Sequence, residues 1–461
     1  MTPIRTSKLF LQNKAALDGS CLLRYNGCVQ FYPQGVSMKK NKATLLLALL
    51  AALLLCACAK EPSSPEDTAP QSEEATTNER DLGALLGEEK NESYRYRKYE
   101  RGIVLTRYLA EETAVVVPAK IDGVAVRGIG ENTFSRQNFL ISVSIPDSIF
   151  EIAQGAFAES PKLTVLTVSE NNRWYVSIDN VLYDAEKTTL LAFAGGNALS
   201  EFTVPNTVTL LGRQAFAGAV NLRRVTLGAT IKDYGTGTFS SCSALESVIL
   251  EDETLRVIPE DFFNGCISLH DFSMPPAVER IGARAFQLCS ALESITLPRT
   301  LTELGDNAFG KCQKLKEIAV PDSVKTMGES VFTGCDHMQS ASLPKSMTVL
   351  PADTFSFCYA LHSISLPEQL TEIGANAFYH CMALRSLPIP TTVVKIGAEA
   401  FKDCYGFGSI YIPATVKSIG KDVFLLGNPN AKPRKYTTVR CAKGSAAMEY
   451  CIENEVPYTA S

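Results

Sequence analysis

The sequence predicts a solenoid of about twelve stacked coils of 23 residues, with a parallel β-sheet, short helical turns on the return path and a cap at each end. Eight cysteines recur every 23 residues, with one step of 24, and a phenylalanine precedes each cysteine by three positions. A fixed period is typical of repeats that bury their apolar faces only against their neighbours. The predicted core phenylalanines are Phe239, Phe263, Phe286, Phe309, Phe332, Phe355, Phe378 and Phe401, and the cysteines are Cys242, Cys266, Cys289, Cys312, Cys335, Cys358, Cys381 and Cys404.

One repeat is clearest between Leu292 and Cys312. The alternation of apolar residues over Ile295–Leu297 predicts a half-buried strand, and Pro298 ends it because proline has no donor for the sheet. Gly305 indicates a turn. Phe309 then follows on a short helical turn that places its ring in the core.

Further phenylalanines extend the series at both ends, and one interval is irregular. Phe134, Phe157 and Phe216 precede the cysteine series and Phe424 follows it, which gives about twelve coils. The 59 residues from Phe157 to Phe216 do not fit a whole number of coils. The excess, near 169–197, has two β-rich runs and predicts an inserted hairpin. The hairpin either stands out from the solenoid or pairs alongside it as an irregular coil.

The cysteine position selects small side chains. In other coils the same position holds Ser160, Ala219 or Gly427. Neighbouring cysteines would point in parallel toward the core, so a disulfide between them would strain the backbone. We therefore expect buried free thiols that behave as small hydrophobic groups. For Cys441 and Cys451 both a bridge and two free thiols are open.

A segment that begins at Met38 has the pattern of an export signal. Residues 38–57 combine three lysines with the apolar run Ala43–Leu55, which is too short for a membrane-spanning helix. Leu55 and Ala57 stand three positions and one position before Cys58, the arrangement of a lipoprotein signal peptide. Cys58 is therefore the predicted lipidation site, and its acyl chains would attach the protein to a membrane. The alternative is an ordinary secretory signal.

The remaining divisions follow from composition. Residues 1–37 do not fit an export signal, and we interpret them as a mis-called start before Met38. Residues 58–92 are acidic and poor in aliphatic side chains, which predicts a disordered tether. Residues 93–121 are expected to form an N-terminal β cap. Residues 122–430 hold the repeats and 431–461 the C-terminal cap.

The repeats resemble a known family. Ile295-Thr-Leu-Pro, Leu304-Gly, Ala308-Phe and Cys312 are similar to the BspA-type (treponemal-type) leucine-rich repeat, over roughly residues 120–461. The resemblance implies a leucine-rich-repeat fold and adhesion to host extracellular-matrix proteins or to other bacteria. Two positions depart from the pattern: Pro388 falls within a strand, and Tyr234 stands where isoleucine is usual.

Composition and motifs argue against several functions. The net charge of −5 and the absence of a basic stripe argue against nucleic-acid binding. The four histidines fall in different coils, and no catalytic, cofactor-binding or metal-binding motif occurs. We therefore expect a protein that is not an enzyme and uses no cofactor or metal. The oligomeric state is not predicted.

Outward-facing strand positions supply the candidate binding residues, because alternate residues of a strand face opposite sides. Either these serines only tolerate a crowded ladder, or they form a broad docking strip. Trp174 and Tyr175, in the inserted hairpin, either contact a partner or pack back on the solenoid. The strand candidates are Ser294, Thr296, Ser340, Ser342, Ser363, Ser365, Ser409 and Tyr411.

These observations predict a non-enzymatic lipoprotein of the bacterial cell envelope that binds protein ligands through its repeat surface. The membrane would be reached only through the N-terminal lipid, on the outer membrane or cell surface. An adhesin for host matrix proteins or other bacteria is the first hypothesis. The alternative is a periplasm-facing scaffold that organises envelope proteins.

Overall fold

The computed structural model describes residues 80–427 and 435–461. The predictions for residues 1–37, for the signal peptide at 38–57 and for Cys58 fall outside these residues. Within the described part of the chain, no helix combines the length and the apolar character needed to span a bilayer. All described residues belong to one compact unit, Thr76–Ser461.

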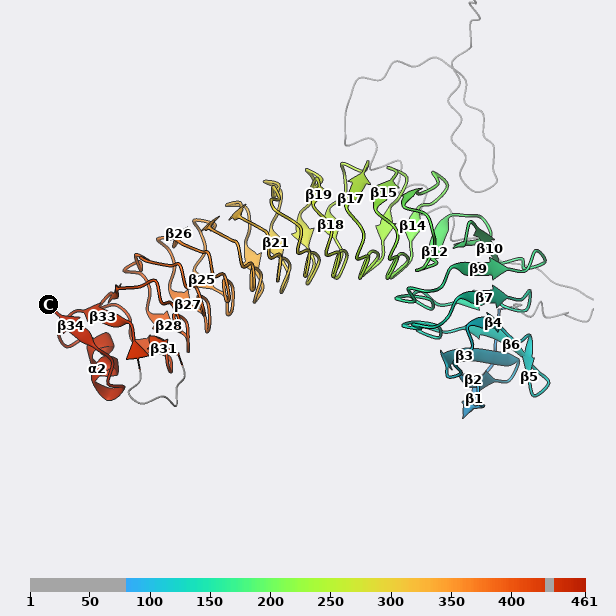
Figure 1. Ribbon diagram of the computed structural model, residues 1–461, viewed down its shortest axis with the longest axis horizontal. Coiled ribbons are helices and arrows are strands. Elements are labelled where there is room, and N and C mark those ends of the chain that lie inside the picture. Colours follow the sequence, from blue (N-terminus) through green and yellow to red (C-terminus); the bar gives the residue numbers. More distant parts are fainter. Residues whose placement is uncertain (1–79, 428–434) are drawn as a thin grey trace, which may run out of the picture. The chain divides into compact units, whose positions relative to one another are not determined.

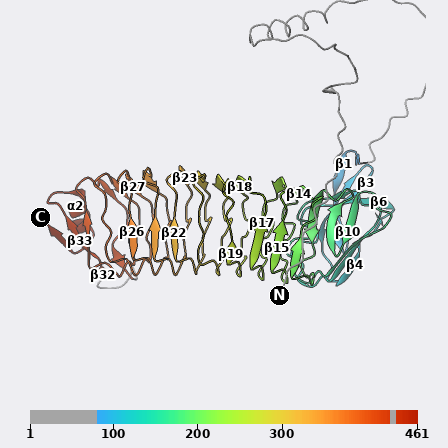
Figure 2. The same cartoon turned by 90° about the horizontal axis from the view of Figure 1, so that it is seen from above.

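The predicted solenoid of coils with a parallel β-sheet is confirmed, and most coils contribute to two parallel ladders rather than one. Figure 2 shows the two rows, one with β15, β17, β22 and β26 and the other with β14, β18, β23 and β27. The first ladder comprises β4 (Ala114–Val116), β7 (Ser142–Ile145), β9 (Val165–Val168), β13 (Glu201–Thr203), β15 (Arg224–Leu227), β17 (Ser247–Leu250), β19 (Asp271–Phe272), β22 (Glu317–Ala319), β24 (Ser340–Ser342), β26 (Ser363–Ser365), β29 (Ser409–Ile412), β33 (Thr438–Cys441) and β34 (Tyr458–Ala460).

The second ladder is made of shorter strands, most of two residues. Its strands are β8 (Glu151–Ile152), β14 (Leu210–Leu211), β16 (Asp233–Tyr234), β18 (Val257–Ile258), β20 (Arg280–Ile281), β21 (Glu303–Leu304), β23 (Thr326–Met327), β25 (Val349–Leu350), β27 (Glu372–Ile373), β28 (Lys395–Ile396) and β30 (Ser418–Ile419). Successive coils pair in register at a spacing of 23 residues, as between Glu303 and Thr326.

The ladders give about 15 coils. Twelve contain the predicted phenylalanines, and the others are the coil of β9, which carries the insertion, and the two formed by β33 and β34. Residues 294–297 and 386–389 run along the first ladder without strand assignment. Pro388 explains the second case, because it cannot donate to a neighbouring coil.

The core contains a column of phenylalanine rings, one in each of twelve coils, which the insertion interrupts between Phe157 and Phe216. Neighbouring rings stack at 5.1 Å between Phe286 and Phe309 and at 5.9 Å between Phe309 and Phe332. The column ends on tyrosines, with Tyr108 5.5 Å from Phe134 and Tyr450 5.8 Å from Phe424. All twelve predicted rings are at most 3% exposed.

The inserted segment is a meander that joins the second ladder. Its strands are β10 (Tyr175–Ile178), β11 (Val181–Asp184) and β12 (Thr189–Phe193), and β12 pairs in parallel with β14. It also divides the core. Val181, Tyr183, Leu190 and Phe193 belong to the long C-terminal core cluster, whereas Leu182, Leu191, Ala192 and Ala194 belong to the N-terminal one.

The N-terminal cap begins earlier than predicted. It comprises β1 (Leu85–Lys90), β2 (Tyr94–Tyr99), β3 (Gly102–Tyr108), β5 (Lys120–Ile121) and β6 (Val124–Ile129). Strand β1 lies within the segment predicted to be a disordered tether, 58–92, so that boundary was wrong. The strand is almost fully exposed and pairs with β2 through its backbone and through Glu88–Arg97 and Glu89–Lys98 ion pairs. Composition indicates order through aliphatic residues that can be buried, so it does not reveal a strand that is almost fully exposed.

The return path consists of tight turns where short helical turns were expected. After Gly305, Ala308 N–H donates to the Gly305 carbonyl and Cys312 N–H to the Phe309 carbonyl, three residues back in each case. Between these bonds Asn307 and Lys311 adopt φ values of 55° and 60°. Their N–H groups therefore point away from their own coil and donate to Glu329 and Thr333 of the next.

One α-helix occurs among the described residues, and it belongs to the C-terminal cap (Figure 1). Helix α2 (Ala446–Glu453) begins at Ser445, whose side chain accepts a hydrogen bond from Met448 N–H. Ala447 and Cys451 of the helix are buried against the last coils. An antiparallel pair, β31 (Leu425–Leu426) and β32 (Lys435–Tyr436), precedes it.

Candidate functional site

Six of the predicted binding residues lie together along the first ladder. Ser294, Thr296, Ser340, Ser342, Ser363 and Ser365 line a groove of about 530 Å³ that crosses four coils. We call it the serine groove, with residues 294–297, 317–319, 340–342 and 363–365 as its walls and floor. Ala341 leaves room in the groove, since every other coil with a core phenylalanine carries the larger Val, Ile, Leu or Phe where Ala341 stands.

The hydroxyl groups of the serine groove have no hydrogen-bond partner within the described protein. Five of the six residues are exposed, and Ser340 is half-buried. The contrast is Ser144, whose hydroxyl bonds to that of Thr167 at 2.8 Å on the same ladder nearer the N-terminus. The groove thus presents a row of free donors and acceptors, with the exposed Glu317 as its single charged group.

The other predicted residues lie apart from this groove. Ser409 and Tyr411 are on β29, beyond the strandless coil at 386–389, and Tyr411 is 49% exposed. Tyr175 packs back on the solenoid: its hydroxyl accepts a hydrogen bond of 2.8 Å from Ile152 N–H. Burial raises the pKa of Tyr175 above its ordinary value. Tyr175 therefore belongs to the packing of the insertion.

Trp174 remains accessible to a ligand. It is half-buried, the guanidinium of Arg80 lies 4.1 Å from its ring centre, and it lines a hollow of about 700 Å³ with Arg127 and Arg173. Its backbone is held by Asn172, whose side-chain oxygen accepts from Trp174 N–H at 2.8 Å.

A second surface was missed by the sequence reading. Phe357, Tyr359, Tyr379, His380 and Tyr405 gather on the turns of three successive coils, and we call them the aromatic patch. The Phe357 and His380 rings stack at 5.2 Å, and the Tyr379 ring meets His380 edge-on at 4.4 Å. Phe357, Tyr359 and Tyr405 are 37%, 39% and 51% exposed. Clustered exposed aromatic side chains are typical of binding hot spots.

Charged groups hold the aromatic patch in place. His380 Nε2 lies 3.3 Å from a carboxylate oxygen of the buried Asp403, whose other oxygen accepts from Gly427 N–H. Lys402 reaches Glu399 at 2.8 Å and lies 5.4 Å from the Tyr379 ring centre. Burial raises the pKa of the Tyr379 hydroxyl, so this ring is a neutral hydrogen-bond donor at ordinary pH.

The signal for the aromatic patch was present in the sequence. Most residues just before and just after the cysteines are at least partly exposed, and in two neighbouring coils these include Phe357, Tyr359 and His380. The prediction considered only the strand positions, where alternation assigns an outward side. The turn positions have no such alternation, and their direction depends on the left-handed residues of the turn.

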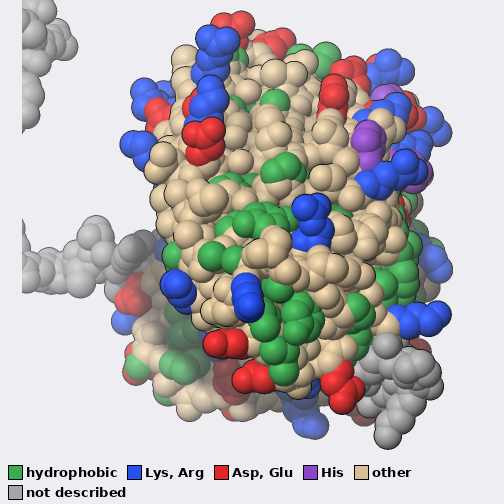
Figure 3. Space-filling model, turned by 90° about the vertical axis from the view of Figure 1, so that its left-hand side faces the viewer, with side chains coloured by type: hydrophobic (Ala, Val, Ile, Leu, Met, Phe, Trp, Pro, Cys, Tyr) green, Lys and Arg blue, Asp and Glu red, His purple; other side chains and the backbone are tan. Residues whose placement is uncertain are grey.

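Charged side chains elsewhere pair between coils. Arg223–Glu246, Arg256–Glu279 and Lys316–Glu293 each join residues 23 apart, at 2.8, 2.7 and 2.7 Å. Figure 3, seen from the C-terminal end, shows acidic and basic side chains alternating along one border and hydrophobic groups on the end face. Ile452 and Tyr458 of the C-terminal cap are exposed. The exposed ion pairs between coils, such as Arg223–Glu246, contribute little to stability.

No metal-binding group occurs among the described residues. In the parts of the chain that the structure covers, no three His, Cys, Asp or Glu side chains come close enough to hold a metal ion. The cysteine thiols are buried, and burial raises the pKa of Cys289, Cys335 and Cys381 well above the ordinary value. Such thiols are poor nucleophiles.

Fold and surface together define a leucine-rich-repeat solenoid of the bacterial type. The family model described as "BspA type Leucine rich repeat region" matches six copies over residues 120–181, 190–316 and 279–407. The chain therefore belongs to the BspA-type leucine-rich-repeat family. No curated protein matches it.

Solved structures of leucine-rich-repeat proteins are similar to the chain. A protein from Bacteroides ovatus is 24% identical over 81% of this chain and 99% of its own, with a TM-score of 0.52. A leucine-rich cell surface protein from Faecalibacterium prausnitzii is 23% identical over 74% of this chain and 96% of its own, at a TM-score of 0.40. The T. pallidum leucine-rich repeat protein is 19% identical over 70% of this chain and 91% of its own, with a TM-score of 0.26.

Proposed function

We propose that this protein is a non-enzymatic, lipid-anchored protein of the bacterial cell surface that binds a protein ligand through the serine groove. The groove carries the proposal, because it places free hydroxyl groups from several coils on one continuous surface. An extended row of donors and acceptors without deep pockets suits another protein's surface better than a small molecule, which binds in concave, mostly apolar sites.

The aromatic patch supports a protein ligand as well. Phe357, Tyr359 and Tyr405 supply the large side chains that dominate binding energy in protein interfaces, and the serine groove lacks them. Membership of the BspA-type family and the predicted lipidation at Cys58 favour an adhesin for host extracellular-matrix proteins or other bacteria.

A binding assay with groove-filling variants tests the role of the serine groove. The full chain is titrated against a panel of purified extracellular-matrix proteins and against whole bacterial cells. The double variant Ser342→Arg, Ser365→Arg should weaken binding roughly tenfold or more, because two bulky cations would fill the groove. Ser418→Arg, an exposed serine of the second ladder on β30, is the matched control and should bind normally.

Protease treatment of intact cells tests the location. An adhesin should be cleaved without breaking the outer membrane. A chain that survives until the outer membrane is opened would contradict the adhesin and favour the periplasm-facing scaffold. Unchanged binding by the double arginine variant would contradict the role of the serine groove, but not the proposed location.

A further inference from the structure

Pro351 occupies a repeat position that is glycine in the coils on both sides. A Cβ atom on Gly328 would lie 2.6 Å from the Asp306 nitrogen, and one on Gly374 would lie 2.6 Å from the Ala352 nitrogen. Neighbouring coils therefore approach too closely at this position for a side chain. Proline brings a ring to this position and has no N–H to donate.

The second ladder is interrupted at this proline. In each adjoining step three backbone N–H groups donate to the preceding coil, as Lys325, Thr326 and Gly328 do. At the next step no backbone hydrogen bond joins Thr348 and Val349 to the coil of Lys325, and β23 and β25 fall in different sheets. The only other proline at this position in the series, Pro259, coincides with the sheet boundary between β16 and β18.

The interruption is local. The first ladder stays paired across the same two coils, with Glu317 opposite Ser340. On the turn side Ser330 N–H still donates to the Ala352 carbonyl at 2.9 Å. The two coils are thus joined on both sides of an opening between 324–328 and 347–351.

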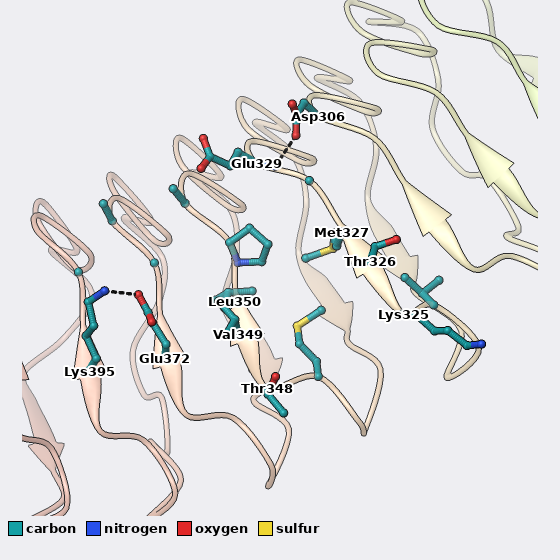
Figure 4. A pocket seen from close by; sticks show the side chains of 18 of the residues that line it. Asp306, Lys325, Thr326, Met327, Glu329, Thr348, Val349, Leu350, Glu372 and Lys395 are labelled. Atoms are coloured by element: carbon teal, nitrogen blue, oxygen red, sulfur yellow. Dashed lines mark hydrogen bonds and ion pairs between the residues drawn. The ribbon is translucent and has the colours of Figure 1, made fainter.

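A groove of about 770 Å³ is centred on this opening, and we call it the Pro351 groove. Its walls are residues 324–329 and 346–352, and Figure 4 shows Met327 between the segments that carry Thr326 and Val349. Met327 and Met347 are partly buried against the core. Methionine side chains adapt to different partners. Val349 is 47% exposed. It occupies the strand position that Thr326 and Glu372 hold in the neighbouring coils.

The two walls offer complementary backbone groups. One wall has the carbonyls of Lys325 and Met327, which no N–H of the next coil reaches, and the other has the N–H groups of Thr348 and Val349. Charges differ between the ends: Asp306 and Glu329 lie at one end and Lys325 toward the other (Figure 4). Of the other charged lining residues, Glu372 and Lys395 pair at 2.6 Å.

We propose that the Pro351 groove binds an extended polypeptide segment of a partner protein. The segment pairs its backbone with the free edge of one or both walls, places apolar side chains on Met327 and Val349, and directs a basic side chain to Asp306 and Glu329. Strand addition at an open edge supplies affinity through backbone bonds and specificity through alternate side chains. This site is separate from the serine groove and does not depend on its proposed role.

Selection from a library tests the proposal. Random nine-residue peptides displayed on phage are selected on the full chain, and the enriched peptides are synthesised and titrated. They should bind Pro351→Gly at least roughly tenfold more weakly, because glycine restores the N–H and lets the coils close. Pro259→Gly makes the same change at the other interruption and should bind normally. Val349→Pro removes a wall donor and should also weaken binding.

Hydrogen exchange gives a second readout on the wild-type chain, so the test survives a variant that does not fold. The Thr348 and Val349 amides should exchange rapidly in the free protein and slowly with bound peptide. The proposal is overturned if no peptide is enriched, if enriched peptides bind wild type and Pro351→Gly alike, or if these amides stay unprotected. It is equally overturned if both amides are already protected in the free chain, by its own N-terminal segment or by a second copy.

Discussion

The thiol of Cys312 donates a hydrogen bond of 3.2 Å to the carbonyl of Phe286, one coil earlier. The same bond recurs for all eight cysteines of the series at 3.0 to 3.3 Å. Ser160 makes it too, at 2.7 Å to Phe134. Nine coils therefore place a donor at the cysteine position, whereas Ala219 and Gly427 show that a small side chain without a donor is also accepted.

Removing a ring from the core column should be far more costly than removing a thiol. Phe309→Ala should lower the free energy of unfolding by about 3–5 kcal/mol through the cavity it leaves. Cys312→Ala should lower it by only about 0.5–1.5 kcal/mol, since it removes one hydrogen bond to the Phe286 carbonyl, which still accepts from Cys289 N–H. Cys312→Ser is the control and should lose less than Cys312→Ala. Equal losses for Phe309→Ala and Cys312→Ala in denaturant titrations would contradict the packing.

Stability should fall at alkaline pH. Burial raises the thiol pKa of Cys266, Cys289, Cys312, Cys335, Cys358, Cys381 and Cys404 above the ordinary value near 9.0. The unfolded chain releases these protons first, so their stabilising contribution is complete below about pH 8.5 and is lost as pH rises toward the folded values. Each thiol should remove up to about 1.4 kcal/mol per pH unit.

Unfolding titrations between pH 8 and about 9.3 measure this effect, where most tyrosines are still protonated in the unfolded chain. The variant Cys312→Ala should show a shallower pH dependence by about one proton. A free energy of unfolding that does not change over this range would show that the thiols are not buried as described.

The cysteines should be unreactive in the folded protein. All ten that the structure describes are buried free thiols, including Cys441 and Cys451, for which the sequence left a bridge open. Burial raises the pKa of Cys451 to about 12. A maleimide should label none of the ten in buffer and all ten in denaturant. Mass spectrometry that finds Cys441 and Cys451 unlabelled in denaturant without reductant would indicate a disulfide.

Leu288→Gly should stabilise the protein. Leu288 has a φ of 64° and is 38% exposed, at a turn position where Gly265 and Gly334 adopt 79° and 69°. A left-handed backbone costs a non-glycine residue about 1–2 kcal/mol, partly offset by the greater entropy that glycine loses on folding. The expected gain is about 0.5–1 kcal/mol in denaturant unfolding. Gly334→Leu should change stability in the opposite direction, and a gain there would contradict the explanation.

The period of the sequence predicted the coil, the ring column, the small position beside it and the residues of the serine groove. Each of these follows from which residues repeat, because every coil meets the same neighbours. The second ladder was not predicted as a strand, since two residues such as Glu303 and Leu304 are too short to show alternation.

Features that depend on a single coil were the ones missed. Pro351 changes the sheet because of how closely its neighbours approach, and that distance is visible only in the folded chain. The aromatic patch depends on the direction of turn residues such as Phe357. Strand β1 forms through backbone pairing and ion pairs rather than through buried aliphatic side chains.

The meander of β11 and β12 has a consequence for how such a chain can vary. Its side chains divide between two separate core clusters. The coils before the meander and the coils after it therefore pack against different faces of the meander. Whole 23-residue units can then be gained or lost on either side without repacking the other. The length of the repeat surface can change in this way while the N-terminal cap stays the same.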